Sequence, residues 1–413
     1  VPDGKAFTAT ITGHKNVSCA GQTNGEITIA AQNFNTTTGY QYSVNNGVNW
    51  ITTTTSPVTI TGLAAATYNV LVRYDASATG VCAYTLPQII TAPAALVTTA
   101  TVTKPATCTT GAEITAISAG GTLAYRYELW DATNTTQVRP SQSTGIFTNV
   151  SAPDSYYIRG YDANNCSDST DAAVVVTAPP ALNAALSTTT DYCYTTANPA
   201  TLDVTVTGGT GPFTYKLDSN AAVSSALTSY SFSNVAPGTH TILVTDSNNC
   251  IATIANIVIA PQIGFNVSLI NDLTCLVNAS IGNPVETNGN GGPYTYTVTF
   301  GGTTTAVTSF PYTATVAGNY VFTVKDSRGC PATSNTIVVT PKTTPAHTTV
   351  KTDITCNGLN NGTITVTPSG GFTTTYTYAI KLSTATAYTT QTTNQFTGLA
   401  AGTYDIKVID SKG

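Results

Sequence analysis

The 413-residue chain lacks methionine altogether and carries only 8% charged residues, two tryptophans and three histidines. With a formal net charge of −5, it has no basic surface for nucleic acid or for an anionic membrane. No apolar run approaches the roughly 18 residues of a membrane-spanning helix, so we expect no membrane insertion. The first residues show no charged segment followed by an apolar one, and hence no signal peptide. We interpret the chain as an internal or processed piece of a longer secreted protein.

Threonine instead is abundant, at 85 of the 413 positions. Apolar, β-branched and aromatic residues are plentiful and the net charge is small, which excludes disorder by composition. Thr, Gly and Pro interrupt every stretch, and no 3.6-residue periodicity is sustained, which excludes a helical protein. The composition therefore predicts an all-β fold.

The nine cysteines reveal an internal repeat. They alternate between two sets. The first set recurs every 81 to 89 residues, and members of the second set follow 55 to 63 residues later. The first set is Cys19, Cys108, Cys193, Cys275 and Cys356, and the second is Cys82, Cys166, Cys250 and Cys330.

Three further landmarks keep the same period. Each period has an aromatic pair two residues apart, then a strand that ends at an aspartate, then an apolar run that stops at a proline. The pairs are Tyr40/Tyr42, Tyr125/Tyr127, Phe213/Tyr215, Tyr294/Tyr296 and Tyr376/Tyr378. These landmarks predict five modules, at 1–93, 94–179, 180–261, 262–341 and 342–413. The chain stops one residue before a tenth cysteine is due, so we expect the fifth module to be truncated before its last strand.

Period-2 alternation dominates each module. In Tyr294–Phe300, three threonines alternate with Tyr, Val and Phe, as in a strand with one buried and one solvated face. Six or seven such strands in each 80 to 90 residues, separated by Gly, Asn and Pro, are typical of an antiparallel sandwich. The expected architecture is a tandem array of five immunoglobulin-like β-sandwich modules, extended and semi-rigid because linkers are nearly absent.

The cysteines are expected to form disulfides, because a domain of this size has a thin core. Closing a loop within each module stabilises it by about 4 kcal/mol. The favoured bonds are Cys19–Cys82, Cys108–Cys166, Cys193–Cys250 and Cys275–Cys330. An alternative stays open. The loop after the first strand and the loop before the last strand, which carry the two cysteines of a module, lie at opposite ends of a seven-strand sandwich. Cys19 could therefore instead bond Cys166 of the next module. The partner of Cys356 is expected just beyond the last residue. Either pairing indicates an oxidising, extracellular compartment.

The modules resemble a known family. The recurring pattern runs Cys-x-Gly-x-x-Asn-Gly-x-Ile-Thr, Gly-Gly-x-x-x-Tyr-x-Tyr, then Gly-Leu-x-x-Gly-Thr-Tyr and a strand to Asp-x-x-Gly-Cys. It is similar to the SprB repeat, which occurs in tandem in very large surface adhesins of gliding Bacteroidetes. The fifth module matches best, through Cys356, Gly370, Gly371, Tyr376, Tyr378, Tyr404 and Asp410, while the second and fourth depart around their first cysteine. The resemblance implies type IX secretion, surface display, and a role in adhesion or gliding motility.

Few residues suggest chemistry. The repeated aspartates 75, 162, 246, 326 and 410 are interpreted as turn-forming rather than as calcium ligands, because each loop offers only one or two carboxylates. His14, His240 and His347 lie in different modules, which argues against a metal site, and His240 is expected to be a packed structural residue. The aromatic pairs share the apolar face of their strand, so core packing is favoured over sugar stacking. Trp50 and Trp130 are the candidate ligand contacts.

We therefore predict no catalytic, metal or cofactor site, and no enzyme activity. The favoured function is a structural stalk or filament segment of a large cell-surface adhesin, extracellular, which gives reach and stiffness. Alternatives are a glycan-binding array or accessory modules of a secreted hydrolase. The expected partners are neighbouring modules of the same chain, and surface glycans or other copies in a filament.

Overall fold

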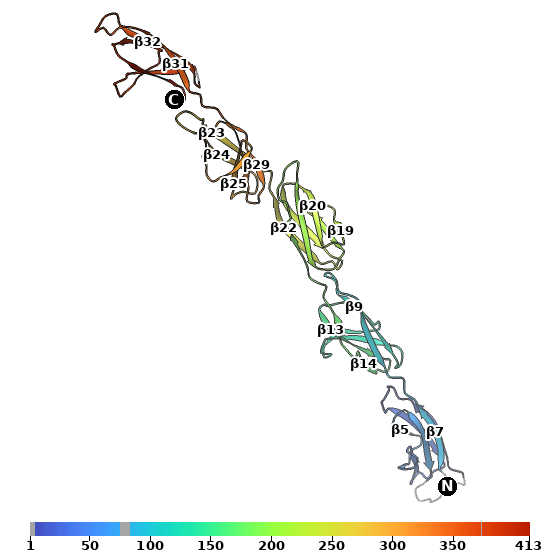
Figure 1. Cartoon of the computed structure of the whole chain (residues 1–413). Helices are drawn as coiled ribbons and strands as arrows, with labels where there is room; N and C mark the ends of the chain where they lie inside the picture. The colour runs from blue at the N-terminus through green and yellow to red at the C-terminus, as the bar shows by residue number, and fades with distance from the viewer. Residues whose placement is uncertain (1–4, 75–82, 373) are drawn as a thin grey trace. The chain divides into compact units, whose positions relative to one another are not determined.

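The computed structural model describes residues 5–74, 83–372 and 374–413. Every regular element over these residues is a β-strand (Figure 1), which confirms the all-β prediction. The described residues contain no helix that is long and apolar enough to span a bilayer. The described strands form ten sheets, which follow one another along the chain in five pairs. Each pair has one three-stranded sheet and a second sheet of three to five strands.

Sheet pair 1 shows the arrangement that the other pairs share. Its antiparallel sheets have the orders β1-β2-β5 and β4-β3-β6-β7, which are A-B-E and C′-C-F-G in immunoglobulin lettering. This order confirms the immunoglobulin-like prediction. The strands are β1 (Thr8–Lys15), β2 (Gly25–Gln32), β3 (Tyr40–Ser43), β4 (Ile51–Thr53), β5 (Val58–Leu63), β6 (Ala66–Arg73) and β7 (Tyr84–Ile90).

Sheet pairs 2 and 3 repeat this order, and in pair 2 the last strand is split in two. Pair 2 contains β8 (Val97–Lys104), β9 (Ala112–Ala119), β10 (Arg126–Trp130), β11 (Gln137–Gln142), β12 (Ile146–Val150), β13 (Asp154–Tyr161), β14 (Ser167–Ser169) and β15 (Val174–Val176). Pair 3 contains β16 (Leu182–Leu186), β17 (Ala200–Gly208), β18 (Phe213–Leu217), β19 (Val223–Ser225), β20 (Ser229–Val235), β21 (Gly238–Thr245) and β22 (Ile251–Ile259).

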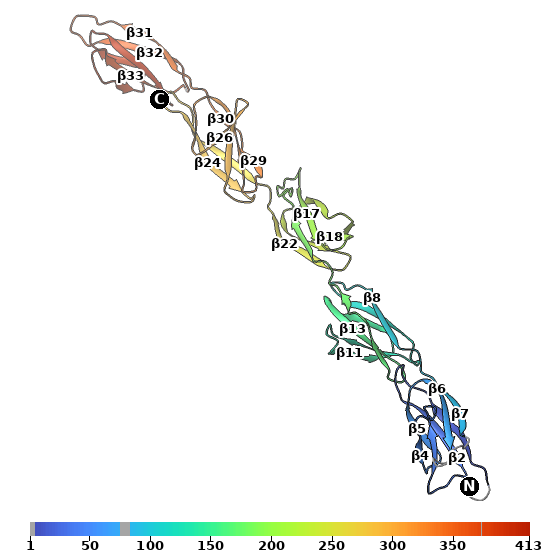
Figure 2. The same ribbon diagram turned by 60° about the horizontal axis from the view of Figure 1, so that its bottom comes forward.

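Sheet pairs 4 and 5 follow, and β31, β32 and β33 of pair 5 are seen together in Figure 2. Pair 4 contains β23 (Gly264–Asn271), β24 (Ala279–Thr287), β25 (Thr295–Phe300), β26 (Thr303–Val307), β27 (Tyr312–Ala314), β28 (Gly318–Lys325), β29 (Pro331–Thr333) and β30 (Ile337–Val339). Pair 5 contains β31 (Pro345–Thr352), β32 (Gly362–Gly370), β33 (Tyr376–Leu382), β34 (Thr389–Gln391), β35 (Gln395–Leu399) and β36 (Tyr404–Asp410).

The chain divides into two compact units. The first runs to Asn183 and adds Gly208–Phe213 and Thr245–Ile251, so it holds pairs 1 and 2 with two turns of pair 3. The second comprises Ala184–Thr207, Thr214–Val244 and Ala252–Gly413, and holds most of pair 3 with pairs 4 and 5. Every disulfide described below lies inside one unit.

The core of each pair lies between its two sheets, where the apolar residues of alternating strands meet. In pair 1, Ile27 and Ile29 of β2 and Val70 and Val72 of β6 are fully buried in one cluster. The alternation predicted for Tyr294–Phe300 is confirmed, because Val298 lies in the pair 4 core and the aromatic residues pack against it. Of the described threonines only Thr98 and Thr170 are buried. On the solvated face of a strand, the branched Cβ of threonine suits the pleat and its hydroxyl contacts water.

The last strand of pairs 1 to 4 covers one edge of the second sheet. In pairs 1 to 4 the strand that ends at the repeated aspartate is flanked on its outer edge by a further strand or strands: β7, β14 and β15, β22, or β29 and β30. In pair 5, β36 pairs with β33 alone, and no strand follows it in the described chain, which ends at Gly413.

Candidate functional site

Three disulfides join successive sheet pairs. Each links a first-set cysteine of one pair to a second-set cysteine of the next, with Cα–Cα distances of 5.7, 4.9 and 5.2 Å, within the range for disulfides. The bonds are Cys19–Cys166, Cys108–Cys250 and Cys193–Cys330. They interleave along the sequence, so each bond closes a loop that overlaps the next.

The favoured within-module pairings are therefore wrong for the described cysteines. Cys108 lies before β9, whereas the loop of Cys166 meets the far end of β9, where Asp162 accepts a hydrogen bond from the backbone of Thr122. An eight-residue strand separates the two loops by about 26 Å, far beyond the reach of a disulfide. Cys193–Cys250 and Cys275–Cys330 fail for the same reason, and Cys19 bonds Cys166 rather than Cys82, which lies outside the described residues.

Two cysteines of the described chain have no disulfide partner. Cys275 of pair 4 and Cys356 of pair 5 are both exposed thiols. Both belong to the first set, whose earlier members bond forward to the next pair.

A buried aspartate organises the loop of each second-set cysteine. One carboxylate oxygen of the aspartate accepts hydrogen bonds from two backbone N–H groups: that of the cysteine, at 2.9 Å in all three loops, and that of the residue two after the aspartate. The three aspartates are at most 5% exposed: Asp162, Asp246 and Asp326. Each carboxylate therefore fixes the backbone that carries the disulfide.

The other oxygen of each aspartate ties this loop to a glycine turn on the opposite sheet. It accepts the backbone N–H of the residue after the glycine at 2.8, 2.9 and 2.8 Å, from Thr122, Thr210 and Asn290. The glycine has positive φ and lies so close that a Cβ there would come within 3.1 Å of that oxygen. Left-handed backbone and close approach both require glycine. We call this arrangement of aspartate, cysteine loop and glycine turn the aspartate clamp.

The clamp confirms the turn-forming interpretation of these aspartates, because their oxygens are occupied by N–H donors. Burial would raise the pKa of Asp326, but the backbone N–H groups of Asn290, Cys330 and Arg328, with the Asn290 side chain, lower that pKa below its ordinary value. The described residues hold no group of three or more potential metal ligands.

The residue two positions after the aspartate reaches the preceding sheet pair. Asn164 donates its side-chain N–H to the Ser18 carbonyl at 3.0 Å, beside the Cys19–Cys166 bond. The carbonyl of Asn248 accepts the N–H of Cys108 at 2.9 Å, and the guanidinium of Arg328 lies 3.8 Å from the ring centre of Tyr192. Each disulfide therefore sits in a wider junction of polar and cation–π contacts.

Three segments of the chain, 11–49, 187–222 and 348–384, match the family model described as the SprB repeat. Similarity to the SprB repeat is therefore shown for these three segments. The matches fall in sheet pairs 1, 3 and 5 and lie outside pairs 2 and 4, which are the modules whose first-cysteine context departs from the sequence pattern. Each matched SprB segment includes a first-set cysteine.

Solved structures similar to this chain include several domain arrays. The three N-terminal domains of the bacteriophage RB49 highly immunogenic outer capsid protein are 14% identical, with a TM-score of 0.36, over 59% of this chain and 99% of that one. Sidekick-1 immunoglobulin domains 1–5 are 9% identical, with a TM-score of 0.24, over 98% and 96%. The human desmocollin-1 ectodomain is 11% identical, with a TM-score of 0.22, over 86% and 84%. No curated protein matches the chain.

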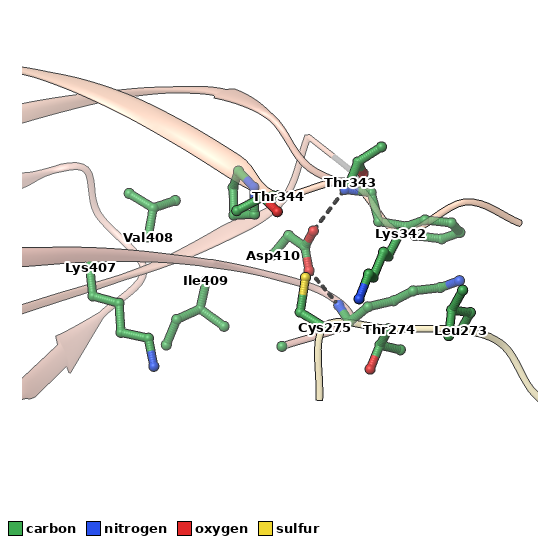
Figure 3. A pocket seen from close by; sticks show the side chains of 14 residues that line it. Leu273, Thr274, Cys275, Lys342, Thr343, Thr344, Lys407, Val408, Ile409 and Asp410 are labelled. Carbon is green, nitrogen blue, oxygen red and sulfur yellow. Dashed lines mark hydrogen bonds between the residues drawn. The ribbon is translucent and has the colours of Figure 1, made fainter. Parts of the chain in front are cut away.

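Pair 5 contacts pair 4 through an ion pair. Lys412, two residues after Asp410, places its Nζ 2.7 Å from a carboxylate oxygen of Asp272 and 3.4 Å from the ring centre of Phe372. Asp272 also accepts the N–H and the hydroxyl of Thr340. Cys275, Phe372, Asp410 and Lys412 line a hollow of about 180 Å³ at this junction (Figure 3).

Acid is expected to weaken this junction. Burial would raise the pKa of Asp272, but hydrogen bonds from Lys412, Thr340 and Leu273 lower it to about 2, against an ordinary 3.8. A lowered folded-state pKa stabilises the fold above the ordinary pKa, and that stability is lost as the pH falls towards 2. The shift corresponds to about 2 kcal/mol.

The measurement is the free energy of unfolding between pH 5 and pH 2 for the native chain and for Asp272→Asn. The native chain should lose about 2 kcal/mol more than the variant over this interval. Parallel curves for the two proteins would show that Asp272 does not carry this pH dependence.

Both tryptophans stack against arginine from the same sheet pair. The guanidinium of Arg73 lies 3.9 Å from the ring centre of Trp50, and that of Arg159 lies 3.7 Å from Trp130. Trp130 also donates its indole N–H to Glu128 at 3.2 Å. Both rings are half-buried and have structural partners. Their role as ligand contacts stays a prediction.

The remaining candidate residues are structural. His240 hydrogen-bonds Asp218 at 2.7 Å and the carbonyl of Ala236 at 2.8 Å, which confirms it as a packed residue. His14 and His347 are exposed on other sheet pairs. The aromatic pairs pack in the cores, as predicted, with Tyr40 and Tyr215 fully buried.

Sequence alone does not pair the glycine turn with the aspartate. The recurring Gly-Gly, at 120–121, 208–209 and 370–371, is the sequence signal for this turn.

Proposed function

We propose that this chain is a non-catalytic, extracellular structural segment, a stalk or filament, of a large cell-surface adhesin. The observation that carries the proposal is the pattern of disulfides, which join each sheet pair to the next rather than closing a single pair. A bond of this kind restrains the hinge between neighbours, and restrained hinges are what a load-bearing spacer needs. The three segments that match the SprB repeat add support, because that repeat occurs in adhesins displayed on cell surfaces.

In this proposal each sheet pair is one module, with the limits 1–93, 94–179, 180–261, 262–341 and 342–413. The disulfides suit an oxidising compartment outside the cytoplasm. Secretion by the type IX pathway, and a role in the gliding motility of Bacteroidetes, complete the proposal. Covalent links between modules increase the reach and stiffness of the chain, because they restrict the motion of one module relative to the next.

Small-angle X-ray scattering of the oxidised chain tests this function. An end-to-end arrangement of five sandwiches, each at least about 26 Å long, would give a length of about 130 Å or more and a radius of gyration of about 38 Å or more. A compact fold of the same length would have a radius of gyration near 22 Å. The variant with every cysteine replaced by serine should scatter as a more flexible chain. A compact particle, or identical flexibility in both proteins, would contradict the stalk.

A further inference from the structure

A histidine takes the place of a tyrosine where the chain of sheet pair 3 crosses from one sheet to the other. In pairs 1, 4 and 5 a tyrosine early in the strand that ends at the repeated aspartate donates its hydroxyl to the carbonyl four residues before it. These bonds run from Tyr68 to Ala64, from Tyr320 to Val316 and from Tyr404 to Ala400, at 3.1, 2.7 and 3.1 Å. In pair 2, Tyr156 donates to Ser151 at 3.2 Å. We call this contact the corner bond; in pair 3 the corner residue is His240.

The ring of His240 makes the same corner bond through a nitrogen. Its Nε2 lies 2.8 Å from the carbonyl oxygen of Ala236, four residues before it. A carbonyl oxygen can only accept a hydrogen bond, so Nε2 must carry a proton. The bond ties β21 to the residue that follows β20 of the other sheet.

The second ring nitrogen of His240 faces a carboxylate. Its Nδ1 lies 2.7 Å from Oδ2 of Asp218, in the turn after β18, and the other oxygen of Asp218 accepts the N–H of Thr241 at 2.8 Å. Burial would raise the pKa of Asp218, but the hydrogen bonds from His240 and Thr241 hold that pKa below its ordinary value. The carboxylate is therefore ionised near neutral pH and can only accept, so Nδ1 must carry a proton as well.

The other titratable groups of pair 3 lie away from this ring. Within the described part of the chain, Asp218 is the ion-pair partner of His240. Lys216 lies between two buried residues of β18 and so points to the outer face, as does Asp203 between two buried residues of β17. Asp191 is exposed in the loop before β17. The titratable side chains on the inner face are two phenols, uncharged near pH 7: Tyr215 and Tyr230.

We propose that His240 keeps both ring protons in the folded chain, so that a charged ring fastens the corner of sheet pair 3 and releases it at mildly alkaline pH. Loss of the Nδ1 proton would set a nitrogen lone pair against the carboxylate of Asp218, and loss of the Nε2 proton would break the bond to Ala236. A tyrosine hydroxyl keeps its proton over the same pH range. Of the five described corners, only that of pair 3 therefore titrates near neutral pH.

The direction of the pH dependence follows from the number of protons bound. A histidine in an unfolded chain gives up its second proton near pH 6.5. Above that pH the unfolded chain binds fewer protons than the folded chain, so the stability of pair 3 falls as the pH rises. Below that pH both states hold the proton, and the ion pair contributes in full. In the stalk proposed above, pair 3 becomes the module whose rigidity depends on pH; this consequence alone rests on the proposed function.

Nitrogen-15 NMR of the histidine rings tests the protonation directly. The chain has three histidines, and the variants His14→Gln and His347→Gln assign their signals. At pH 7.5 both ring nitrogens of His240 should show the chemical shifts of an imidazolium, whereas the exposed His14 and His347 should show neutral rings. A neutral ring at His240 would overturn the proposal, whether or not the chain is a stalk.

Hydrogen exchange of the β21 amides measures the release of the corner. After correction for the pH dependence of chemical exchange, the opening constant should rise about tenfold between pH 6 and pH 8.5. The β28 amides of pair 4, whose corner residue is Tyr320, are the internal control and should change by less than about twofold. Equal changes at β21 and β28 would contradict a release specific to pair 3.

Two variants separate the ion pair from the corner bond. Asp218→Asn supplies an amide that accepts the Thr241 N–H and donates to a neutral Nδ1, so the corner closes without a charge. His240→Tyr installs the corner residue of the other pairs. In both variants the opening constant of β21 should change by less than about twofold over the same pH range. A tenfold rise that persists in either variant would show that the His240–Asp218 pair does not carry the pH dependence.

Discussion

Pulled to full extension from its two ends, the oxidised chain should reach only about a third of the length of the reduced chain. The disulfides interleave, so the shortest covalent path runs 1–19, crosses to 166–193, and crosses again to 330–413. At about 3.5 Å per residue this path measures roughly 450 Å, against roughly 1,400 Å for all 413 residues. Residues 20–165 and 194–329 lie outside this path and cannot be extended by the applied force until a disulfide is reduced.

Single-molecule force spectroscopy with and without a reductant makes this measurement. The chain with every cysteine replaced by serine is the control, and its final length should be the same in both conditions. The favoured bonds within single modules would leave a path of roughly 640 Å, about four tenths longer than the interleaved path. An oxidised length at or above that value would contradict the interleaved staples.

Replacing Asp326 by alanine should lower the free energy of unfolding of sheet pair 4 by about 3 kcal/mol. The carboxylate is 5% exposed and accepts the backbone N–H groups of Asn290, Arg328 and Cys330 at 2.8, 3.0 and 2.9 Å. Alanine leaves these donors without their acceptor in a site with little access to water, and each unsatisfied group costs about 1–3 kcal/mol. The turn that carries Cys330 loses its anchor as well.

Native-state hydrogen exchange of the β28 amides measures this effect locally, which suits a chain of several modules. The matched control is Asp353→Ala, because the Asp353 side chain is 79% exposed and its ion pair is with the equally exposed Lys351. That variant should change stability by less than about 0.5 kcal/mol. Equal effects for the two variants would contradict the aspartate clamp.

Local pattern predicts much of this fold. Alternation in Tyr294–Phe300 identifies the buried face of a strand, because side chains of a pleated strand point alternately to its two sides. The turn role of Asp246 follows in the same way from its place between a strand and a cysteine loop. These features depend on neighbours only a few residues away.

The disulfide pairing and the clamp depend on residues far apart in sequence. Spacing shows that Cys108 and Cys166 recur together, but not that the length of β9 separates them. Likewise the sequence around Gly121 indicates only a turn, because the contact between Gly121 and Asp162 exists only in the folded chain. The arginine partners of Trp50 and Trp130 come from other strands, so the sequence offered two isolated aromatic residues rather than two stacked pairs.

Disulfide mapping tests most directly whether this chain is a covalently stapled scaffold. The oxidised protein is digested without reduction, and the linked peptides are identified by mass spectrometry. We expect peptides that join Cys19 to Cys166, Cys108 to Cys250 and Cys193 to Cys330. Peptides that join Cys108 to Cys166 and Cys193 to Cys250 would contradict the stapled scaffold.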